Sequence, residues 1–426
     1  MIETLRNAWK IPELRKKLMF TALILLLYRI GNVIPVPYIN VDLLTQFFNS
    51  ELSETILGLY NAMSGSAFSQ GTVLALSIQP YINASIIIQL LTVAIPALER
   101  MAKEEGEEGK KKLTMITRIS TVGLGLIMGW AYFMMIKNSG MGILTQDGWL
   151  AMIVIVLTFT AGSAIVMWLG EQITAYGIGN GISMILFANI ISGLDDGAVT
   201  MYNMFFTSTW WQALIAVVGI AALVLFIVFV NDAERRIPVQ YAKRVVGRKI
   251  YGGQSTNLPI KVSMSGVMPI IFAQSICSLP ATICAFVPGW TSGWWYDNVW
   301  SASSWTYVVV YFLMIFFFSW FYASIQYDPV EIGNNLKKNG GFIPGFRPGK
   351  PTSDFIKKVI GKIVVFGAVY LAVVALLPIL AGKFMPSVQN IAIGGTSIII
   401  VVGVALETVK ALEAQMLMRH YKGFLD

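Results

Sequence analysis

Long apolar runs separated by polar segments extend through the whole chain, and nearly all of them are long enough to cross a bilayer. They lie near residues 18–36, 73–98, 115–136, 149–170, 180–194, 210–231, 264–287, 305–325, 360–382 and 393–416. A membrane-spanning helix needs about 20 predominantly apolar residues. The pattern therefore predicts ten transmembrane helices, of which the run at 180–194 is the shortest.

The composition indicates an all-α integral membrane protein. Of the 426 residues, 56% are hydrophobic and 13% are charged, whereas soluble proteins average about 25% charged residues. Ten spans divide into two sets of five, and an odd number of helices per set reverses the orientation of the second set. We therefore expect two pseudo-symmetric inverted halves, residues 1–200 with spans one to five and residues 201–426 with spans six to ten.

Basic residues are confined almost entirely to alternate connections. Of the 31 Lys and Arg side chains, 28 lie in the N-terminal segment, in the connections after the second, sixth and eighth spans, and in the tail. The positive-inside rule then predicts a multi-pass protein with both termini in the cytoplasm. Arg29 lies within the first span, where a side chain that reaches the outer interface is the expected arrangement.

Two of the cytoplasmic connections, 232–261 and 326–358, are much longer than a helix connection needs. Loops of this length usually have a function or are disordered. The first alternates basic and β-prone residues, which predicts a projecting hairpin. The second is rich in Gly and Pro around Arg347, which predicts a stiff, turn-rich loop that exposes this side chain. Solvated loops whose charge only orients the protein are the alternative.

The segment 61–96 joins an uncharged, Ser- and Gly-rich stretch, 61–70, to an apolar run that contains Pro80 and ends at Pro96. The first part is too polar to face lipid. Irregular backbone at membrane depth is tolerated only where protein surrounds it or water reaches it. The segment therefore predicts a re-entrant element that leads into a spanning helix.

Several bulky aliphatic residues lie beside glycines or prolines in the predicted spans, where helices are least regular. The set comprises Ile78, Ile82, Ile182, Leu186, Ile271 and Ile400. A ring of such side chains would form an apolar constriction that closes to water and ions by dewetting. Ordinary helix packing is the alternative explanation.

The sequence offers little chemistry for catalysis. It contains no nucleotide-binding loop, metal-ligand cluster or nucleophile–base pair, and its single histidine, His420, lies near the C-terminus. We therefore expect neither an enzyme nor a cofactor or metal site. A secondary transporter would carry ionisable groups near the membrane midplane, and the predicted spans are nearly free of charge there.

Seven motifs, in order along essentially the whole chain, resemble those of the SecY family, the pore-forming subunits of the bacterial protein-conducting channel. They are YRIGNVIPVP, IQPYINASIIIQLL, WLGEQITAYGIGNGIS, RRIPVQYAKR, QSTNLPIKVSMSGVMPIIFAQSI, NLKKNGGFIPGFRPGKPT and GGTSIIIVV. The resemblance implies a gated channel that passes unfolded secretory polypeptides with signal sequences across the bacterial plasma membrane and releases transmembrane segments sideways into lipid. It also implies SecE-like and SecG-like small membrane subunits, a YidC-like insertase, and the SecA ATPase or the translating ribosome as the driving partner.

The same resemblance implies roles for particular residues. Residues 61–71 resemble the plug, a short helix that fills the outer funnel at rest, and include Asn61, Ser64, Gly65, Phe68 and Gly71. The six aliphatic residues above match the pore ring. The second span (73–98) and the seventh resemble the lateral gate, with Asn83, Gln89 and Thr92 facing Gln274, Ser275 and Leu279. Arg248, Lys249 and Arg347 match loop positions that engage SecA or the ribosome. Ser77 departs from the family pattern, which often has glycine there.

Overall fold

The computed structural model is mostly helical and describes residues 2–422 except 50–55, 104, 147, 208–209, 242–243, 247–248, 252–254, 265, 287–297, 300–303 and 385–394. Each of the ten predicted apolar runs contains a helix. These are α2 (Pro12–Gly31), α5 (Gln79–Ala94), α7 (Gly106–Asn138), α8 (Trp149–Tyr176), α9 (Gly181–Ser192), α11 (Trp210–Asp232), α12 (Met268–Phe286), α13 (Trp305–Gln326), α15 (Lys350–Phe384) and α17 (Gly395–Lys422). Within the described residues, six helices are long and apolar enough to cross a membrane, and the bent pair α5–α6 makes a seventh. The prediction of a helical multi-pass membrane protein is confirmed.

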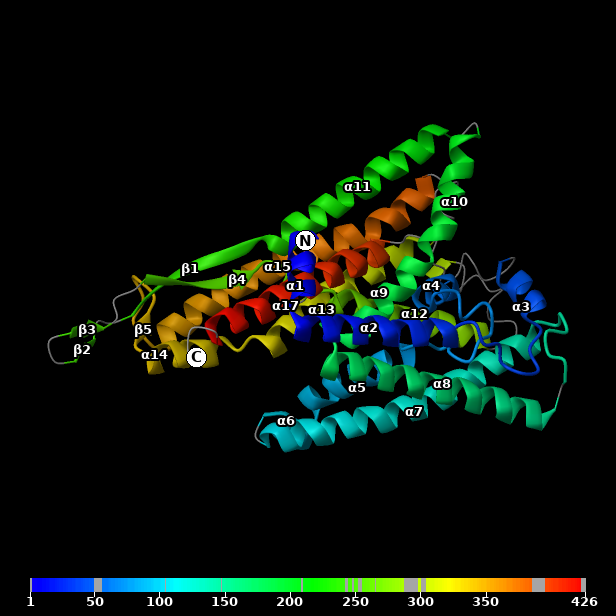
Figure 1. Cartoon of the computed structure of the whole chain (residues 1–426), viewed down its shortest axis with the longest axis horizontal. Helices are drawn as coiled ribbons and strands as arrows, with labels where there is room; N and C mark the ends of the chain where they lie inside the picture. Colours follow the sequence, from blue (N-terminus) through cyan, green and yellow to red (C-terminus); the bar gives the residue numbers. More distant parts are fainter. Residues whose placement is uncertain are drawn as a thin grey trace.

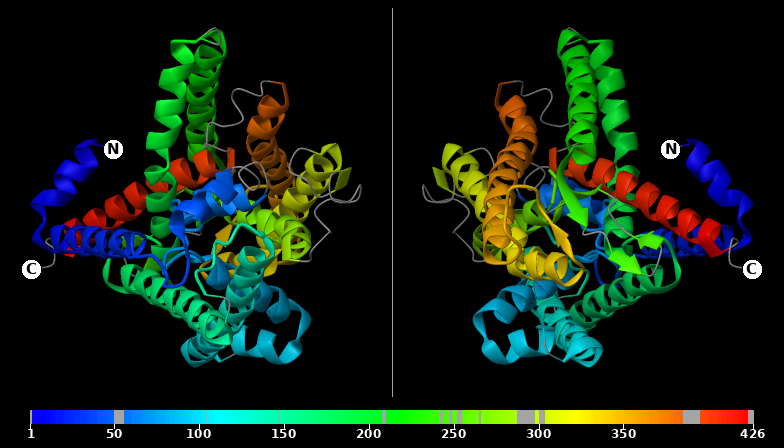
Figure 2. Two further views of the ribbon diagram at one scale, coloured as in Figure 1. Left: turned by 90° about the vertical axis from the view of Figure 1, so that its right-hand side faces the viewer. Right: turned by 90° about the vertical axis from the view of Figure 1, so that its left-hand side faces the viewer.

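The connections gather at two ends of the helix bundle (Figure 1). At one end lie the hairpin of β1 (Glu234–Tyr241) and β4 (Ser255–Lys261), the helix α14 (Pro329–Lys338) and the helix α6 (Pro96–Lys103). At the other lie α3 (Val41–Phe47) and the junction between α10 (Leu194–Phe205) and α11. The basic connections after the second, sixth and eighth spans therefore share one end, as the alternation of charge predicts. Figure 2 shows the bundle from each end, with α10 and α11 projecting beyond the other helices.

The gate helix predicted over 73–98 is shorter than expected, since α5 begins at Gln79 and ends at Ala94. Pro80 lies in the first turn of α5, where its missing N–H costs no intrahelical hydrogen bond. Ile95 has extended backbone, with φ −109° and ψ 112°, the conformation favoured before a proline. The chain then bends by 106° into α6. Each proline thus begins a helix, so the prediction of one continuous helix was wrong at both ends.

The loop 232–261 forms the predicted hairpin. β1 (Glu234–Tyr241) pairs antiparallel with β4 (Ser255–Lys261), and β2 (Arg244–Val246) pairs with β3 (Lys249–Tyr251) at the tip. The loop 326–358 is more regular than predicted. It contains α14 and the short strand β5 (Gly341–Phe342), which pairs with β1, and from Lys350 onward it belongs to α15. Only the stretch between β5 and α15 is the expected turn-rich segment.

The main hydrophobic core lies at the centre of the bundle, with side chains from α2, α5, α8, α9, α11, α12, α13, α15 and α17. A second core lies toward the end that holds α3 and is rich in aromatic rings. A glycine-rich turn separates α8 from α9. A Cβ at Gly181 would clash with the carbonyl oxygen of Gly170, so the close approach of these helices requires glycine.

Candidate functional site

The predicted plug is only partly helical. The helix α4 spans Ile56–Ser64, so it begins before the predicted segment 61–71 and ends within it. Gly65 and Gly71 have φ of +66° and +58°, in the left-handed region that glycine adopts without strain. From Gly65 to Ser77 the chain forms turns and one isolated bridge, so the prediction of a helix over the whole segment was wrong. α4 contacts α9 and α12 and lies among the helices (Figure 1).

Short polar side chains hold the turns of the plug segment. The Ser64 hydroxyl donates to the Asn61 carbonyl oxygen (2.9 Å) and accepts from the Phe68 N–H (3.0 Å). The Asn61 side-chain oxygen accepts from the Ser69 N–H (2.9 Å). The Tyr132 hydroxyl of α7 donates to the Phe68 carbonyl oxygen (2.6 Å), and the two rings pack edge to face with centroids 4.7 Å apart. The polar composition that made this stretch unusual in the sequence therefore satisfies its irregular backbone.

A buried polar cluster surrounds the C-terminal end of α4. The Asn189 side-chain amide of α9 donates to the Met63 carbonyl oxygen (2.8 Å), to the Tyr28 hydroxyl of α2 (2.9 Å) and to the Ser77 hydroxyl (3.2 Å). The hydroxyls of Tyr28 and Ser77 are themselves 3.0 Å apart and hydrogen-bonded. Because the last carbonyl groups of a helix lack intrahelical partners, the Asn189 amide satisfies one that α4 leaves open.

Two further side chains of the α2 terminus approach the end of α4. The Asn32 side-chain amide donates to the Ser64 carbonyl oxygen (3.2 Å). The Nη1 atom of Arg29 is buried without a hydrogen-bond partner among the described residues, and a Cβ built on Gly65 would lie 2.7 Å from it. A cation near a helix C-terminus interacts favourably with the helix dipole. Arg29 therefore turns toward the plug, and the placement of its charge at the outer interface stays a prediction.

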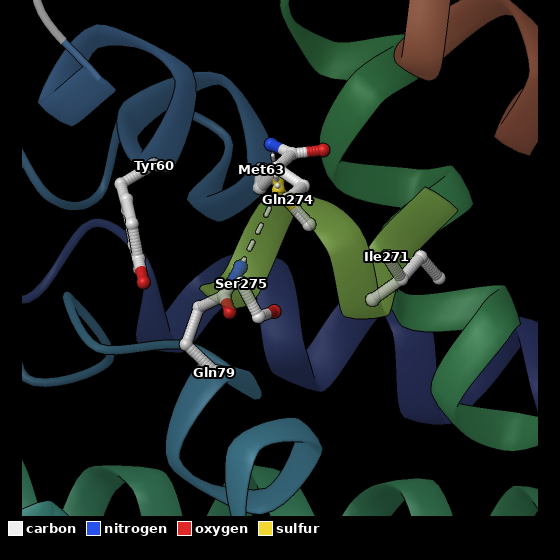
Figure 3. Close-up of a pocket in the computed structure, with 6 residues that line it drawn as sticks. All are labelled: Tyr60, Met63, Gln79, Ile271, Gln274 and Ser275. Atoms are coloured by element: carbon white, nitrogen blue, oxygen red, sulfur yellow. Dashed lines mark hydrogen bonds between the residues drawn. The ribbon is translucent and has the colours of Figure 1, made fainter. Parts of the chain in front are cut away.

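The sulfur of Met63 joins α4 to two other helices. The side-chain amides of Gln79 on α5 and Gln274 on α12 donate to it, with N···S distances of 3.3 and 3.4 Å. With Tyr60, Ile271 and Ser275, these residues line a narrow pocket with space for about one water molecule. Figure 3 shows Met63 between the two glutamines, with Ser275 close to Gln79. A thioether is a weak acceptor, so each contact is easily broken.

The six residues predicted to form the pore ring all lie in or against the central core. Ile78, Ile82, Leu186, Ile271 and Ile400 are buried, and Ile182 is half-buried against the same core. They come from α9, α12, α17 and the start of α5. Ile78 is the N-cap of α5, and its carbonyl oxygen accepts from the Ile82 N–H (3.0 Å). The ring residues thus share one core, and their closure of a pore stays a prediction.

The predicted gate residues differ in their surroundings. α5 and α12 are in contact, and Gln274 and Ser275 are buried on α12. The Asn83 amide lies 4.0 Å from the Met128 sulfur of α7, so this side chain faces α7. Leu279 belongs to α12, with its side chain outside the described residues.

The other two gate residues lie near the C-terminal end of α5. Gln89 is exposed, and its carbonyl oxygen accepts from the Thr92 hydroxyl (2.7 Å). Gln79, which the sequence did not single out, connects α5 to Gln274 of α12 through the Met63 sulfur.

Arg347 is exposed in the turn between β5 and α15. Its carbonyl oxygen accepts from the Thr352 hydroxyl (2.8 Å), and the preceding ring of Phe346 packs on Phe355 of α15, with centroids 4.3 Å apart. These contacts fix the main chain on both sides of Arg347 while its guanidinium stays exposed. The turn-rich segment therefore presents this side chain to solvent, as predicted.

Of the other two predicted contact residues, Lys249 lies at the hairpin tip. The main chain of Lys249 belongs to β3 and pairs with Val246 of β2. Arg248 lies outside the described residues.

Sequence reasoning missed Tyr28, Met63, Gln79 and Asn189. Polarity could have indicated one of them. Asn189 is an amide side chain inside the apolar helix α9, and polar groups in a membrane span rarely face lipid. Among the residues that the structure describes, no group of three or more His, Cys, Asp or Glu side chains is arranged to hold a metal ion.

Comparison with known proteins connects the chain to one family. A family model described as SecY matches residues 72–409. Protein translocase subunit SecY from Streptomyces scabiei is 41% identical over 438 residues, and the same subunit from Halalkalibacterium halodurans is 41% identical over 434 residues, with the whole of each chain covered in both cases. The solved structure described as "The structure of a protein conducting channel" covers 97% of each chain with a TM-score of 0.68 and 18% identity. A second, "Sec61 in the Canine ribosome-channel complex from the endoplasmic reticulum", covers 97% of each chain with a TM-score of 0.64 and 17% identity. Because the sequence identity to these two solved structures is only 18% and 17%, their similarity to this chain supports the fold alone.

Proposed function

Because the chain belongs to the SecY family, we propose that it is the central protein-conducting subunit of a bacterial translocase. It passes unfolded secretory polypeptides across the membrane and releases transmembrane segments sideways into lipid. It is a channel subunit and not an enzyme, in keeping with the names of its relatives. The observation that carries this function is the position of α4, a short helix held among longer ones by side chains of α2, α5, α9 and α12.

The plug and the ring provide two barriers in series. The plug is α4 with the turns that follow it. Met63 and Phe68 pack into the two hydrophobic cores, and the polar contacts of the plug to surrounding helices are a few hydrogen bonds and weak sulfur contacts. Such contacts can be exchanged when a polypeptide enters. The ring is formed by Ile78, Ile82, Ile182, Leu186, Ile271 and Ile400, whose aliphatic side chains offer no ligand to an ion. They can yield to a passing chain of any sequence.

The lateral gate lies between α5 and α12, which belong to different halves of the chain, residues 1–200 and 201–426. The Met63 sulfur contacts a glutamine on each side of this boundary. Separation of α5 from α12 therefore breaks at least one of the two contacts, so opening of the gate and release of the plug are linked. Gln79, Gln274 and Ser275 line the closed gate beside Met63.

The partners follow from the family and from the basic end of the bundle. SecE-like and SecG-like subunits and a YidC-like insertase lie beside the chain in the bacterial plasma membrane, and both termini are cytoplasmic. The hairpin with Lys249 and the turn with Arg347 project from the cytoplasmic face, and Arg248 is proposed as a third contact residue from the family resemblance alone. They contact SecA or the ribosome, and exposed Arg side chains are suited to carboxylates and phosphates. A related channel structure is described as a ribosome-channel complex.

The test is to trap a polypeptide in the channel. The chain is reconstituted in proteoliposomes with SecE-like and SecG-like subunits and SecA, and a secretory precursor is stalled during transport. Photo-crosslinking side chains at Ile82 and Ile271 should react with the precursor. The same probe at Phe229 on α11, which is 76% exposed, should not react. Equal labelling at all three positions would contradict the proposed path.

A further inference from the structure

Ser77 has a backbone conformation that serine rarely adopts. Its φ is +48°, in the left-handed region where a Cβ atom crowds the following carbonyl group. It comes two residues before the first residue of the gate helix α5. Glycine would adopt this conformation without strain, so the presence of serine requires a compensating interaction.

That interaction is provided by the side chain. Ser77 is 1% exposed, and its hydroxyl is hydrogen-bonded to Tyr28 (3.0 Å) and accepts from the Asn189 amide (3.2 Å). The hydroxyl therefore links the start of α5 to α2 and α9. A glycine at this position would leave these two buried polar groups with one partner fewer, which is unfavourable in a low-dielectric interior.

The same amide holds the plug. The Asn189 nitrogen that donates to Ser77 also donates to the Met63 carbonyl oxygen (2.8 Å). Because a carbonyl oxygen only accepts, this contact requires the nitrogen end of the amide to point into the cluster. The hydroxyls of Ser77 and Tyr28 share that nitrogen, and they keep it directed at Met63. The backbone of the plug is thus attached to the start of the gate helix through one side chain.

We propose that Ser77 is a positioning residue that couples the plug to the gate helix, an inference that rests on the proposed channel function. Its hydroxyl holds the Asn189 amide in place for the plug and stabilises the strained turn that begins α5. A movement of α5 that shifts Ser77 then weakens the hold on the Met63 carbonyl oxygen. The closed channel is therefore more stable than it would be with alanine at this position, which has the same backbone strain without the hydroxyl.

The test measures exposure of the plug directly. Ser66, in the plug turn, is replaced by cysteine in a chain whose Cys277 and Cys284 are changed to alanine, and labelling by a water-soluble maleimide is followed in sealed proteoliposomes of the whole complex. Ser77→Ala, which keeps a Cβ in the left-handed backbone, should raise the labelling rate about fivefold, which corresponds to the loss of one hydrogen bond of about 1 kcal/mol. Ser77→Gly loses the same hydrogen bond but relieves the backbone strain, so its labelling rate should rise less than that of Ser77→Ala.

Two controls distinguish a specific release of the plug from a general loss of packing in the protein. Ser163 on α8 is also 1% exposed, but its hydroxyl donates only to the Thr160 carbonyl oxygen of its own helix among the hydrogen bonds found. Ser163→Ala should leave the labelling at position 66 unchanged. A cysteine at Ser139, in the turn after α7, should label equally in all variants.

Three outcomes would overturn the inference. The first is wild-type labelling in Ser77→Ala, and the second is a parallel increase at position 139. The third is faster labelling in Ser77→Gly than in Ser77→Ala, which would mean that added backbone freedom, and not the lost hydroxyl, exposes the plug. Transport of a precursor by the unmodified complex is measured in the same vesicles. Failure of that transport would count against the channel function, whereas unchanged labelling with intact transport would count only against the role of Ser77.

Discussion

Gln79 and Gln274 donate to the same sulfur atom from two different helices. Their amide nitrogens lie 3.3 and 3.4 Å from Sδ of Met63, which extends from α4 between α5 and α12. An amide bonded to sulfur exchanges its partner for water at little cost, because the thioether is a weak acceptor. The contacts that join α5 and α12 through Met63 are therefore weak, which suits a boundary that must open.

Replacing Met63 by leucine should favour the open channel. The change conserves volume, which cores tolerate well, but it leaves two buried amide groups without their sulfur partner. We expect a rise in resting ion conductance of a few fold, consistent with the loss of roughly 1 kcal/mol. Planar-bilayer recording of the reconstituted complex measures it. Met135→Leu in the second core, where the side chain is 4% exposed like that of Met63, should leave the conductance unchanged.

Replacing the ring residues Ile82, Ile182 and Ile271 with serine should also raise resting conductance. Each hydroxyl binds water at a point where an aliphatic side chain excludes it, so dewetting of the constriction becomes less favourable. The effect should increase from one substitution to three. Ile155→Ser, in the buried part of α8, lowers stability without affecting ion flow. A conductance that rises equally in Ile155→Ser would mean that loss of packing, and not loss of the ring, is responsible.

The distribution of hydrophobic and charged residues was sufficient to locate the ten spans and the hairpin, since both follow from periodicity and charge. The sequence did not reveal where α5 starts. Its apolar run continues through 73–78, and only the left-handed backbone of Ser77 and the position of Pro80 delay the helix to Gln79. It also did not predict the surroundings of Asn83, because a helix of 16 residues in contact with several neighbours can turn one side chain toward any of them. The polar cluster around Asn189 depends on four separate segments and has no local pattern.

A cysteine pair tests the gate surface directly. Gln79 and Ser275 line the same narrow pocket from α5 and α12, so Gln79→Cys with Ser275→Cys should crosslink under mild oxidation or with a short bismaleimide. The crosslink should block release of transmembrane segments into lipid, and reduction should restore it. Because Asn83 faces Met128 of α7, Asn83→Cys with Ser275→Cys should react much more slowly. Equal reaction of both pairs would show that the gate surface is not at Gln79.

Reversal of charge at Arg347 should impair transport driven by SecA. The main chain around it is fixed by Thr352 and by the packing of Phe346, so Arg347→Glu presents a carboxylate to the partner at the same place. We expect at least a tenfold loss of precursor translocation into proteoliposomes, with SecA binding measured alongside. Lys357→Glu on the exposed side of α15 changes the charge equally. Near-normal export by Arg347→Glu, or an equal loss in Lys357→Glu, would exclude a specific contact.

Alanine at Gly65 should release the plug by acting on its attachment to the neighbouring helices. Gly65 has φ +66°, and a Cβ there would lie 2.7 Å from Nη1 of Arg29 and 2.9 Å from the Ser192 hydroxyl. Gly140 has nearly the same backbone, φ +69°, and has nothing within 4 Å of the added Cβ. Both substitutions carry the backbone cost of roughly 1–2 kcal/mol, but only Gly65→Ala pushes α4 away from α2 and α9. Labelling of a cysteine at Ser66 should therefore rise in Gly65→Ala and stay at the wild-type rate in Gly140→Ala. If the two variants label alike, the contacts between the plug and its neighbours do not determine how the plug is held.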